Sequence, residues 1–173
     1  MESFTGSAVH TIDPKGRVFI PTNYREALGS DFTIALNNDL RTIAMYPREI
    51  WREKCEAYGR IPDADRVGRN FVRYVMGNTY TGCNLDGQGR ILIPQTLRAM
   101  FGLMEQKDIR FIGVGEYLEL WNIEQYHGLT MTPNDEADRI LDYIYDTYFK
   151  APAGHEALSL IHISEPTRRT PIS

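Results

Sequence analysis

The chain has 173 residues, which is enough for one medium domain or two small ones, and its 42% hydrophobic and 24% charged residues are typical of a soluble globular protein. No apolar run approaches the ~18 residues that a membrane-spanning helix needs, and we expect no secretory signal at the start. The two cysteines are too few for a disulfide framework or a zinc cage and indicate a reducing compartment.

The formal net charge of −4 does not suggest a nucleic-acid-binding protein, but the charge is distributed unevenly. Between residues 134 and 149 lie five acidic residues and one arginine, so this segment alone carries a charge of −4. The remainder of the chain is therefore neutral overall. A neutral body can hold a local basic patch, although the bulk charge gives no support for one.

The first 78 residues contain β-branched and alternating runs, turn residues and prolines placed to begin helices. We expect strands over 8–12, 17–20, 32–36 and 42–46. We expect helices over 22–28, 47–59 and 63–76. The last of these carries an apolar stripe of Val67, Phe71, Tyr74 and Val75 opposite a face with Arg66, Arg69 and Arg73, which is read as a solvated face or as a partner in salt bridges.

The following residues repeat the first part of this plan. Strands are expected up to 85 and over 90–93, 109–114 and 117–121, with a helix over 96–101. The acidic segment has Ile140, Leu141, Ile144, Tyr145 and Tyr148 at helical spacing and predicts an amphipathic helix over 134–149.

The strongest feature is a motif, Asp-x-x-Gly-Arg followed by an apolar run and Ile-Pro, that occurs twice. The copies begin at Asp13 and Asp86, 73 positions apart, and the match extends to Arg25 and Arg98 in the helices that follow. One long period repeated once predicts two related modules, since a solenoid needs three or more copies.

Two interpretations of this motif remain open. Asp13 and Asp86 can shape a β-turn together with Gly16 and Gly89, with each Asp paired to the Arg that ends its motif. Alternatively, a pseudo-twofold axis between the modules would present arginines from both on one face, where they suit phosphates or guanine edges. The two interpretations are compatible, because a paired arginine still has donors that can face outward.

These residues resemble the MraZ family of bacterial transcriptional regulators, which is built from two SpoVT/AbrB-type modules. The resemblance covers Phe4 to about Tyr126 and rests on an ordered set of segments. They are Asp13–Arg17 with Ile20-Pro21, Tyr46-Pro47 with Trp51, Arg69–Arg73 with Gly77, Asp86–Arg90 with Ile91–Pro94, and Ile112–Gly115 with Glu119–Trp121.

The resemblance implies an α+β fold that is mainly β, in which tandem swapped-hairpin modules form an intrachain pseudo-dimeric β-barrel with flanking helices. The predicted parts are a first module at 4–60, a linking helix at 61–78, a second module at 79–128 and the acidic C-terminal helix at 134–149. Residues 158–173 resemble a translated sequencing adapter, and we expect them to be a non-native tail.

The resemblance further implies a cytoplasmic, nucleoid-associated repressor that binds double-stranded DNA as a ring-shaped homo-oligomer. Its expected targets are direct repeats upstream of the division and cell-wall gene cluster, including its own operon. The DNA-facing candidates, carried over by position, are Lys15, Arg17, Arg25, Arg90 and Arg98. Gln88 stands where the first copy has Lys15, so the first module is the stronger candidate.

The sequence gives little support for a catalytic, metal or cofactor site. His10 and His127 are isolated, and the sequence order suggests no catalytic arrangement, so we predict no enzyme activity, no metal site and no cofactor. The glycines at 113 and 115 indicate a hairpin, since a dinucleotide fingerprint needs a third glycine and a following helix. The alternative function is a protein-interaction or scaffold module that uses the same fold without DNA.

Overall fold

The computed structural model describes residues 3–105, 107–126 and 135–150. The chain divides into two units, Met1–Leu129 and Thr130–Ser173. The second unit contains α6 (Asp135–Ile144), which continues as one π-helical turn (Tyr145–Phe149), at the predicted acidic helix. The predicted non-native tail and His127 lie outside the described residues.

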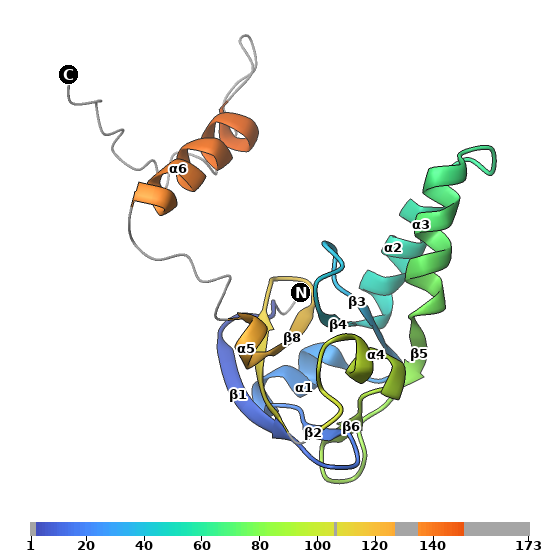
Figure 1. Ribbon diagram of the computed structural model, residues 1–173, viewed down its shortest axis with the longest axis vertical. Helices are drawn as coiled ribbons and strands as arrows, with labels where there is room; N and C mark the ends of the chain where they lie inside the picture. The colour runs from blue at the N-terminus through green and yellow to red at the C-terminus, as the bar shows by residue number, and fades with distance from the viewer. Residues whose placement is uncertain (1–2, 106, 127–134, 151–173) are drawn as a thin grey trace. The chain divides into compact units, whose positions relative to one another are not determined.

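The first unit contains the described strands and five helices (Figure 1). Its strands are β1 (Ser7–Ile12), β2 (Arg17–Phe19), β3 (Phe32–Leu36), β4 (Ile43–Tyr46), β5 (Tyr80–Cys83), β6 (Arg90–Leu92), β7 (Lys107–Gly113) and β8 (Leu118–Asn122). Its helices are α1 (Thr22–Leu28), α2 (Arg48–Gly59), α3 (Arg66–Gly77), α4 (Gln95–Met100) and α5 (Ile123–Tyr126). Each predicted element is found within a few residues of its expected ends, and the short α5 is additional.

Helix α3 begins three residues later than predicted because of its cap. The Asp65 side chain accepts a hydrogen bond from the Gly68 amide at 2.9 Å, which satisfies one of the free N–H groups at the helix start. Asp63 therefore lies outside the helix, where its carboxylate is 3.7 Å from Nε of Arg69. Since Arg73 bonds Asn70 at 2.7 Å on the same exposed side, the arginine face of α3 is a solvated one within this unit.

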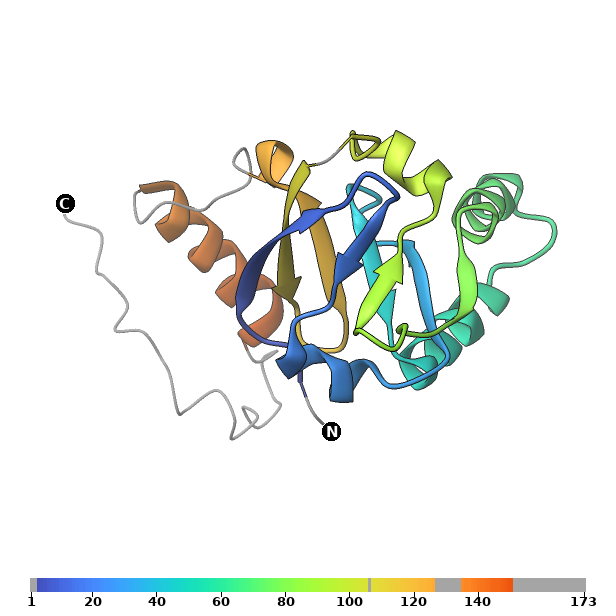
Figure 2. The same cartoon turned by 90° about the horizontal axis from the view of Figure 1, so that it is seen from below.

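The strands of the two repeats exchange partners. The six-stranded antiparallel sheet has the order β1-β7-β8-β4-β3-β5, and β2 and β6 form a separate two-stranded ribbon (Figure 2). The first strand of each repeat pairs with the third strand of the other, as β1 with β7 and β5 with β3. The strand order is therefore unchanged when the repeats are interchanged, which is what a pseudo-twofold axis requires.

The prediction of an α+β fold that is mainly β is confirmed. A closed barrel is not found among the described strands, because β1 and β5 are the two edges of the six-stranded sheet and the ribbon is a separate sheet. The predicted pseudo-dimeric barrel is thus not confirmed, and the described strands form an open sheet and a ribbon.

The repeats share one hydrophobic core, as expected for halves too small to be stable alone. It is built from residues at corresponding positions in both copies. These include Ile20 and Ile93 after the ribbon strands, Tyr24 and Leu97 in the short helices, and Phe32 and Ile109 in strands β3 and β7.

A second, smaller cluster lies under the long helices and includes Tyr46, Trp51 and Val75. The rings of Tyr46 and Trp51 have centroids 5.4 Å apart. Of the predicted stripe on α3 only Val75 is buried, whereas Val67 is 81% exposed. The periodicity therefore predicted the helix correctly but did not predict which residues of the stripe the body covers.

Replacing Ile93 with alanine tests the shared core. Ile93 is fully buried and Leu92, its neighbour, is 58% exposed. We expect Ile93→Ala to lower the free energy of unfolding by about 2–5 kcal/mol, because it removes buried methyl groups and leaves a cavity. The measurement is denaturant unfolding followed by tryptophan fluorescence.

Leu92→Ala is the matched control and should change the free energy of unfolding by no more than about 0.5 kcal/mol. Equal losses for the two variants would contradict the placement of the core.

Candidate nucleic-acid interface

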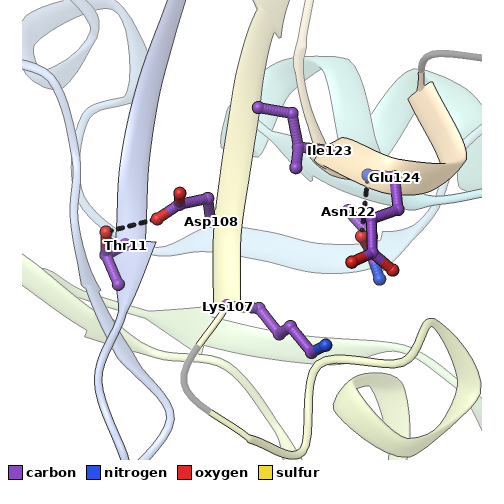
Figure 3. A pocket seen from close by; sticks show the side chains of 6 residues that line it. All are labelled: Thr11, Lys107, Asp108, Asn122, Ile123 and Glu124. Atoms are coloured by element: carbon purple, nitrogen blue, oxygen red, sulfur yellow. Dashed lines mark hydrogen bonds between the residues drawn. The ribbon is translucent and has the colours of Figure 1, made fainter.

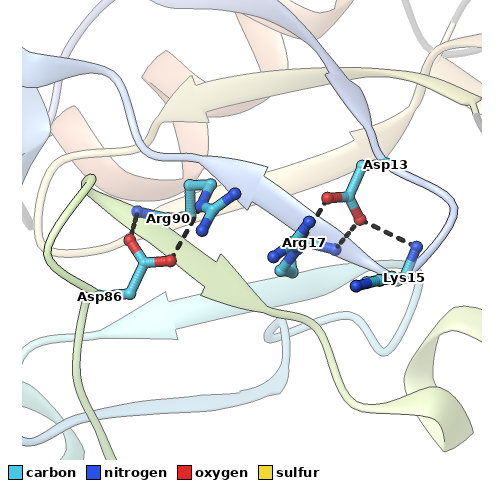
Figure 4. Close-up of polar contacts among 5 residues, drawn as sticks. All are labelled: Asp13, Lys15, Arg17, Asp86 and Arg90. Carbon is cyan, nitrogen blue, oxygen red and sulfur yellow. Dashed lines mark hydrogen bonds and ion pairs between the residues drawn. The ribbon is translucent and has the colours of Figure 1, made fainter.

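The loop between β1 and β2 is organised by the Asp13 carboxylate (Figure 4). One carboxylate oxygen accepts from the amides of Lys15 at 2.9 Å and Arg17 at 2.8 Å, and the other accepts from Nε of Arg17 at 2.8 Å. The Gly16 amide donates to the Asp13 carbonyl at 2.9 Å, and Gly16 has φ +86°, which favours glycine. Three backbone amides and one guanidinium are thus held by a single aspartate.

The loop before β6 repeats this geometry atom for atom. The Asp86 carboxylate accepts from the amides of Gln88 and Arg90, both at 2.9 Å, and from Nε of Arg90 at 2.8 Å. Gly89 has φ +76° and donates to the Asp86 carbonyl at 3.0 Å. In both copies the motif thus forms a turn in which the Asp carboxylate pairs with the guanidinium of the Arg that ends the motif.

These hydrogen bonds lower the pKa of both carboxyl groups. The pKa of Asp13 lies below its usual value of 3.8, chiefly because of the Arg17 amide, with the Arg17 guanidinium and the Lys15 amide adding to the effect. The pKa of Asp86 is lowered in the same way, chiefly by the Arg90 amide. A lowered pKa in the folded state means that the loops are fully stabilised at neutral pH and lose this stabilisation only as the pH falls through the folded-state pKa.

The two loops lie at opposite ends of the β2–β6 ribbon. Arg17 is opposite Leu92 and Phe19 is opposite Arg90 in the antiparallel register. Because the residues between them, Val18 and Ile91, are buried, the ribbon turns the two arginines toward its outer face together with Phe19 and Leu92. Phe19 is 46% exposed, and the Arg90 guanidinium lies 5.8 Å from its ring centre. Each end of the ribbon therefore presents an arginine beside an exposed apolar side chain, Arg17 beside Leu92 and Arg90 beside Phe19.

Arg25 and Arg98 are placed differently from Arg17 and Arg90. Nε of Arg25 donates to the Ile20 carbonyl at 2.8 Å, and Nε of Arg98 donates to the Ile93 carbonyl at 2.9 Å. Their guanidinium groups lie against the glycines of the loops, Arg25 against Gly89 and Arg98 against Gly16. The structure thus gathers every predicted site residue around the ribbon, with Lys15 exposed on its loop.

Sequence reasoning missed two features of this region. One is the crossing of Arg25 and Arg98 to the loop of the opposite repeat, for which the only sequence signal was the same Ile-Pro-x-x-x-Arg spacing in both copies. The other is the exposure of Phe19 and Leu92 beside the arginines, although the alternation along the first strand already places Phe19 on the face of Arg17.

A second polar region is an open cavity of about 450 Å³ (Figure 3). It is lined by Thr11, Lys107, Asp108, Asn122, Ile123 and Glu124. The Thr11 hydroxyl donates to Asp108 at 2.7 Å, and the Asn122 side chain caps the start of α5 by accepting from the Glu124 amide at 3.1 Å. Thr11, Asp108 and Asn122 thus serve local structure. No set of three possible metal ligands occurs in the described ranges, and no helix there is long and apolar enough to cross a membrane.

Comparison with known proteins agrees with the repeat. A family model described as "MraZ protein, putative antitoxin-like" matches residues 3–73 and 76–140, and each matched segment contains one Asp-x-x-Gly-Arg loop. A transcriptional regulator MraZ from Lachnoclostridium phytofermentans is 36% identical over 141 residues, covering 82% of this chain and 94% of that relative. The regulator of the same name from Heliobacterium modesticaldum is 34% identical over 144 residues, covering 81% and 98%. The chain belongs to the MraZ family.

Titration of Asp13 by carboxyl ¹³C NMR tests the loop geometry. The midpoint should lie below 3.8 in the wild-type chain. In Arg17→Ala the midpoint should rise, because the guanidinium is lost, but it should remain below the usual value, because the backbone amides of residues 15 and 17 still donate. A midpoint at or above 3.8 in the wild-type chain would show that the carboxylate does not hold the loop.

Proposed function

We propose that this member of the MraZ family is a sequence-specific DNA-binding transcriptional regulator, and that the outer face of the β2–β6 ribbon is its DNA-contacting surface. The observation that carries the proposal is the pair of identical Asp–Arg loops, which hold Arg17 and Arg90 at the two ends of one exposed ribbon. A two-stranded β-ribbon fits the major groove of B-DNA, and arginine is the side chain that most often reads guanine there.

The chemistry of the ribbon suits this role. The ion pairs with Asp13 and Asp86 use Nε of each arginine, so the Nη groups are the atoms that would meet a phosphate or a guanine edge. Leu92 beside Arg17 and Phe19 beside Arg90 would lie against base edges, where apolar side chains contact thymine methyl groups. Fixing the arginines before binding lowers the entropy lost on association, because fewer rotatable bonds are ordered in the complex.

The first loop is the stronger contact of the two. Lys15 adds a second cation beside Arg17, whereas the corresponding position near Arg90 is the uncharged Gln88. Lys15 is exposed, so it would add a phosphate contact without rearrangement. DNA contact by Arg25 and Arg98 remains a prediction.

The family supports a wider proposal. We propose that the chain acts as a repressor of the division and cell-wall gene cluster that includes its own operon, by binding upstream direct repeats as a ring-shaped homo-oligomer on the nucleoid. The relatives are named transcriptional regulators. A ring would also account for DNA binding by a chain with a net charge of −4, since several weak sites on one assembly bind adjacent repeats with high avidity.

Replacing Arg17 with alanine tests the surface. We expect Arg17→Ala to weaken binding to the DNA directly upstream of this gene by about tenfold or more, the range expected for one arginine contact to a base or phosphate. The measurement is a gel-shift titration at several salt concentrations beside a size measurement, which should be unchanged.

Arg52→Ala is the matched control, because it removes the same charge from the exposed surface of α2, where Arg52 pairs with Glu49 at 2.7 Å. It should leave the affinity close to that of the wild-type chain. Undiminished binding by Arg17→Ala would exclude the ribbon surface. Failure of the wild-type chain to bind, with the assembly intact, would favour the protein-interaction or scaffold function.

A further inference from the structure

We infer that Arg25 and Arg98 are positioning residues, each of which holds the Asp–Arg loop of the opposite repeat in its DNA-contacting conformation. The effect on DNA affinity rests on the proposed function, whereas the effect on the loops does not. Arg25 belongs to α1 of the first repeat but holds the loop before β6, and Arg98 belongs to α4 of the second repeat but holds the loop before β2.

Arg25 closes a short cycle that consists of two hydrogen bonds and one packing contact. The Ile20 amide donates to the Gly89 carbonyl at 3.0 Å, and the carbonyl of the same Ile20 accepts from Nε of Arg25 at 2.8 Å. The guanidinium then returns to Gly89, where it fills the space that a Cβ would need. Gly89 is therefore held by a hydrogen bond to its carbonyl oxygen and by the guanidinium that packs against its α-carbon.

The second cycle has the same three members. The Ile93 amide donates to the Gly16 carbonyl at 2.9 Å, and the Ile93 carbonyl accepts from Nε of Arg98 at 2.9 Å. The Arg98 guanidinium lies against Gly16 at the place of its absent side chain. The occurrence of the same cycle twice, from sequence positions 73 apart, argues that it has a role in the fold and is not a chance packing of long side chains.

Arginine is the side chain that this position requires. Its guanidinium is flat, so it can lie on the backbone of a glycine while Nε donates in the plane to a carbonyl. Lysine keeps the charge but has neither the flat surface nor the Nε donor. The glycines are required for a second reason besides their positive φ, because any side chain would displace the guanidinium.

This arrangement distinguishes the two arginines from simple phosphate contacts. A phosphate contact depends mainly on charge, so lysine replaces arginine there with a small loss. A positioning residue depends on shape and on the direction of its hydrogen bond, so lysine fails almost as completely as alanine. The two roles therefore predict opposite results for the same conservative variant.

Hydrogen exchange of Arg25→Lys in the free protein is the first test. We expect the amides of residues 86–90 to exchange about tenfold faster than in the wild-type chain, with those of Asp13 and residues 15–17 unchanged. Arg98→Lys should give the reverse pattern, and Arg52→Lys neither. Unchanged exchange in both loops, or faster exchange only in the loop of the variant's own repeat, would overturn the inference. Unchanged exchange in the central strands β4 and β8 shows that the variant is folded.

A double-mutant cycle on DNA affinity is the second test. If Arg25 acts through the loop of Arg90, Arg25→Lys should weaken binding about as much as Arg25→Ala. Arg25→Lys should weaken DNA binding little further when Arg90→Ala is already present. When Arg17→Ala is present instead, Arg25→Lys should weaken DNA binding by the same factor as in the wild-type chain. Wild-type affinity in Arg25→Lys, with a salt slope reduced by about one only in Arg25→Ala, would identify a phosphate contact instead. If the wild-type chain does not bind DNA, the proposed function fails, and the exchange experiment still decides whether the arginines hold the loops.

Discussion

The pairing of β2 with β6 is the contact on which the rest of the structure depends. Each strand has only three residues, too few to be stable alone, and each finds its partner in the other repeat. The same pairing leads directly into Ile20 and Ile93, which enter the common core. It also sets the distance between Arg17 and Arg90, because both lie in its register. The core and the proposed DNA surface therefore depend on the same strand pairing.

Each loop beside this ribbon uses one carboxylate for two purposes. Asp13 closes the turn through two amides and fixes the Arg17 side chain through Nε. Since the pKa of the carboxyl group is lowered by these bonds, the pair stays ionised throughout the neutral range. An exposed ion pair alone contributes little to stability. Its value here is geometric, because it keeps a long, flexible side chain in a single direction beside a rigid strand.

The sequence was sufficient for features that depend on nearby residues. The Asp–Arg turns and the short helices after Pro21 and Pro94 follow from local chemistry. The same sequence signals occur in both copies of the repeat. The exchange of β1 and β5 between repeats depends on contacts distant in sequence, as does the crossing of Arg25 to Gly89. The closure of the sheet into a barrel is not confirmed among the described strands, and local patterns could not decide it, since they predict strands but not sheet closure. On α3, Val67 belongs to the predicted stripe yet remains exposed, because periodicity identifies a face but not what covers it.

The symmetric strand order has a consequence for orientation on a nucleic acid. A dimer of two identical chains has no direction, and it suits palindromic sites. Here the two halves belong to one chain, so the sequences of their loops could diverge. The first loop has Lys15 where the second has the uncharged Gln88. If the ribbon binds DNA as proposed, the difference in affinity between the two halves gives each bound molecule a direction along the duplex. Successive molecules could then line up in the same sense along a duplex, reading unidirectional sites with a scaffold whose backbone is almost twofold symmetric.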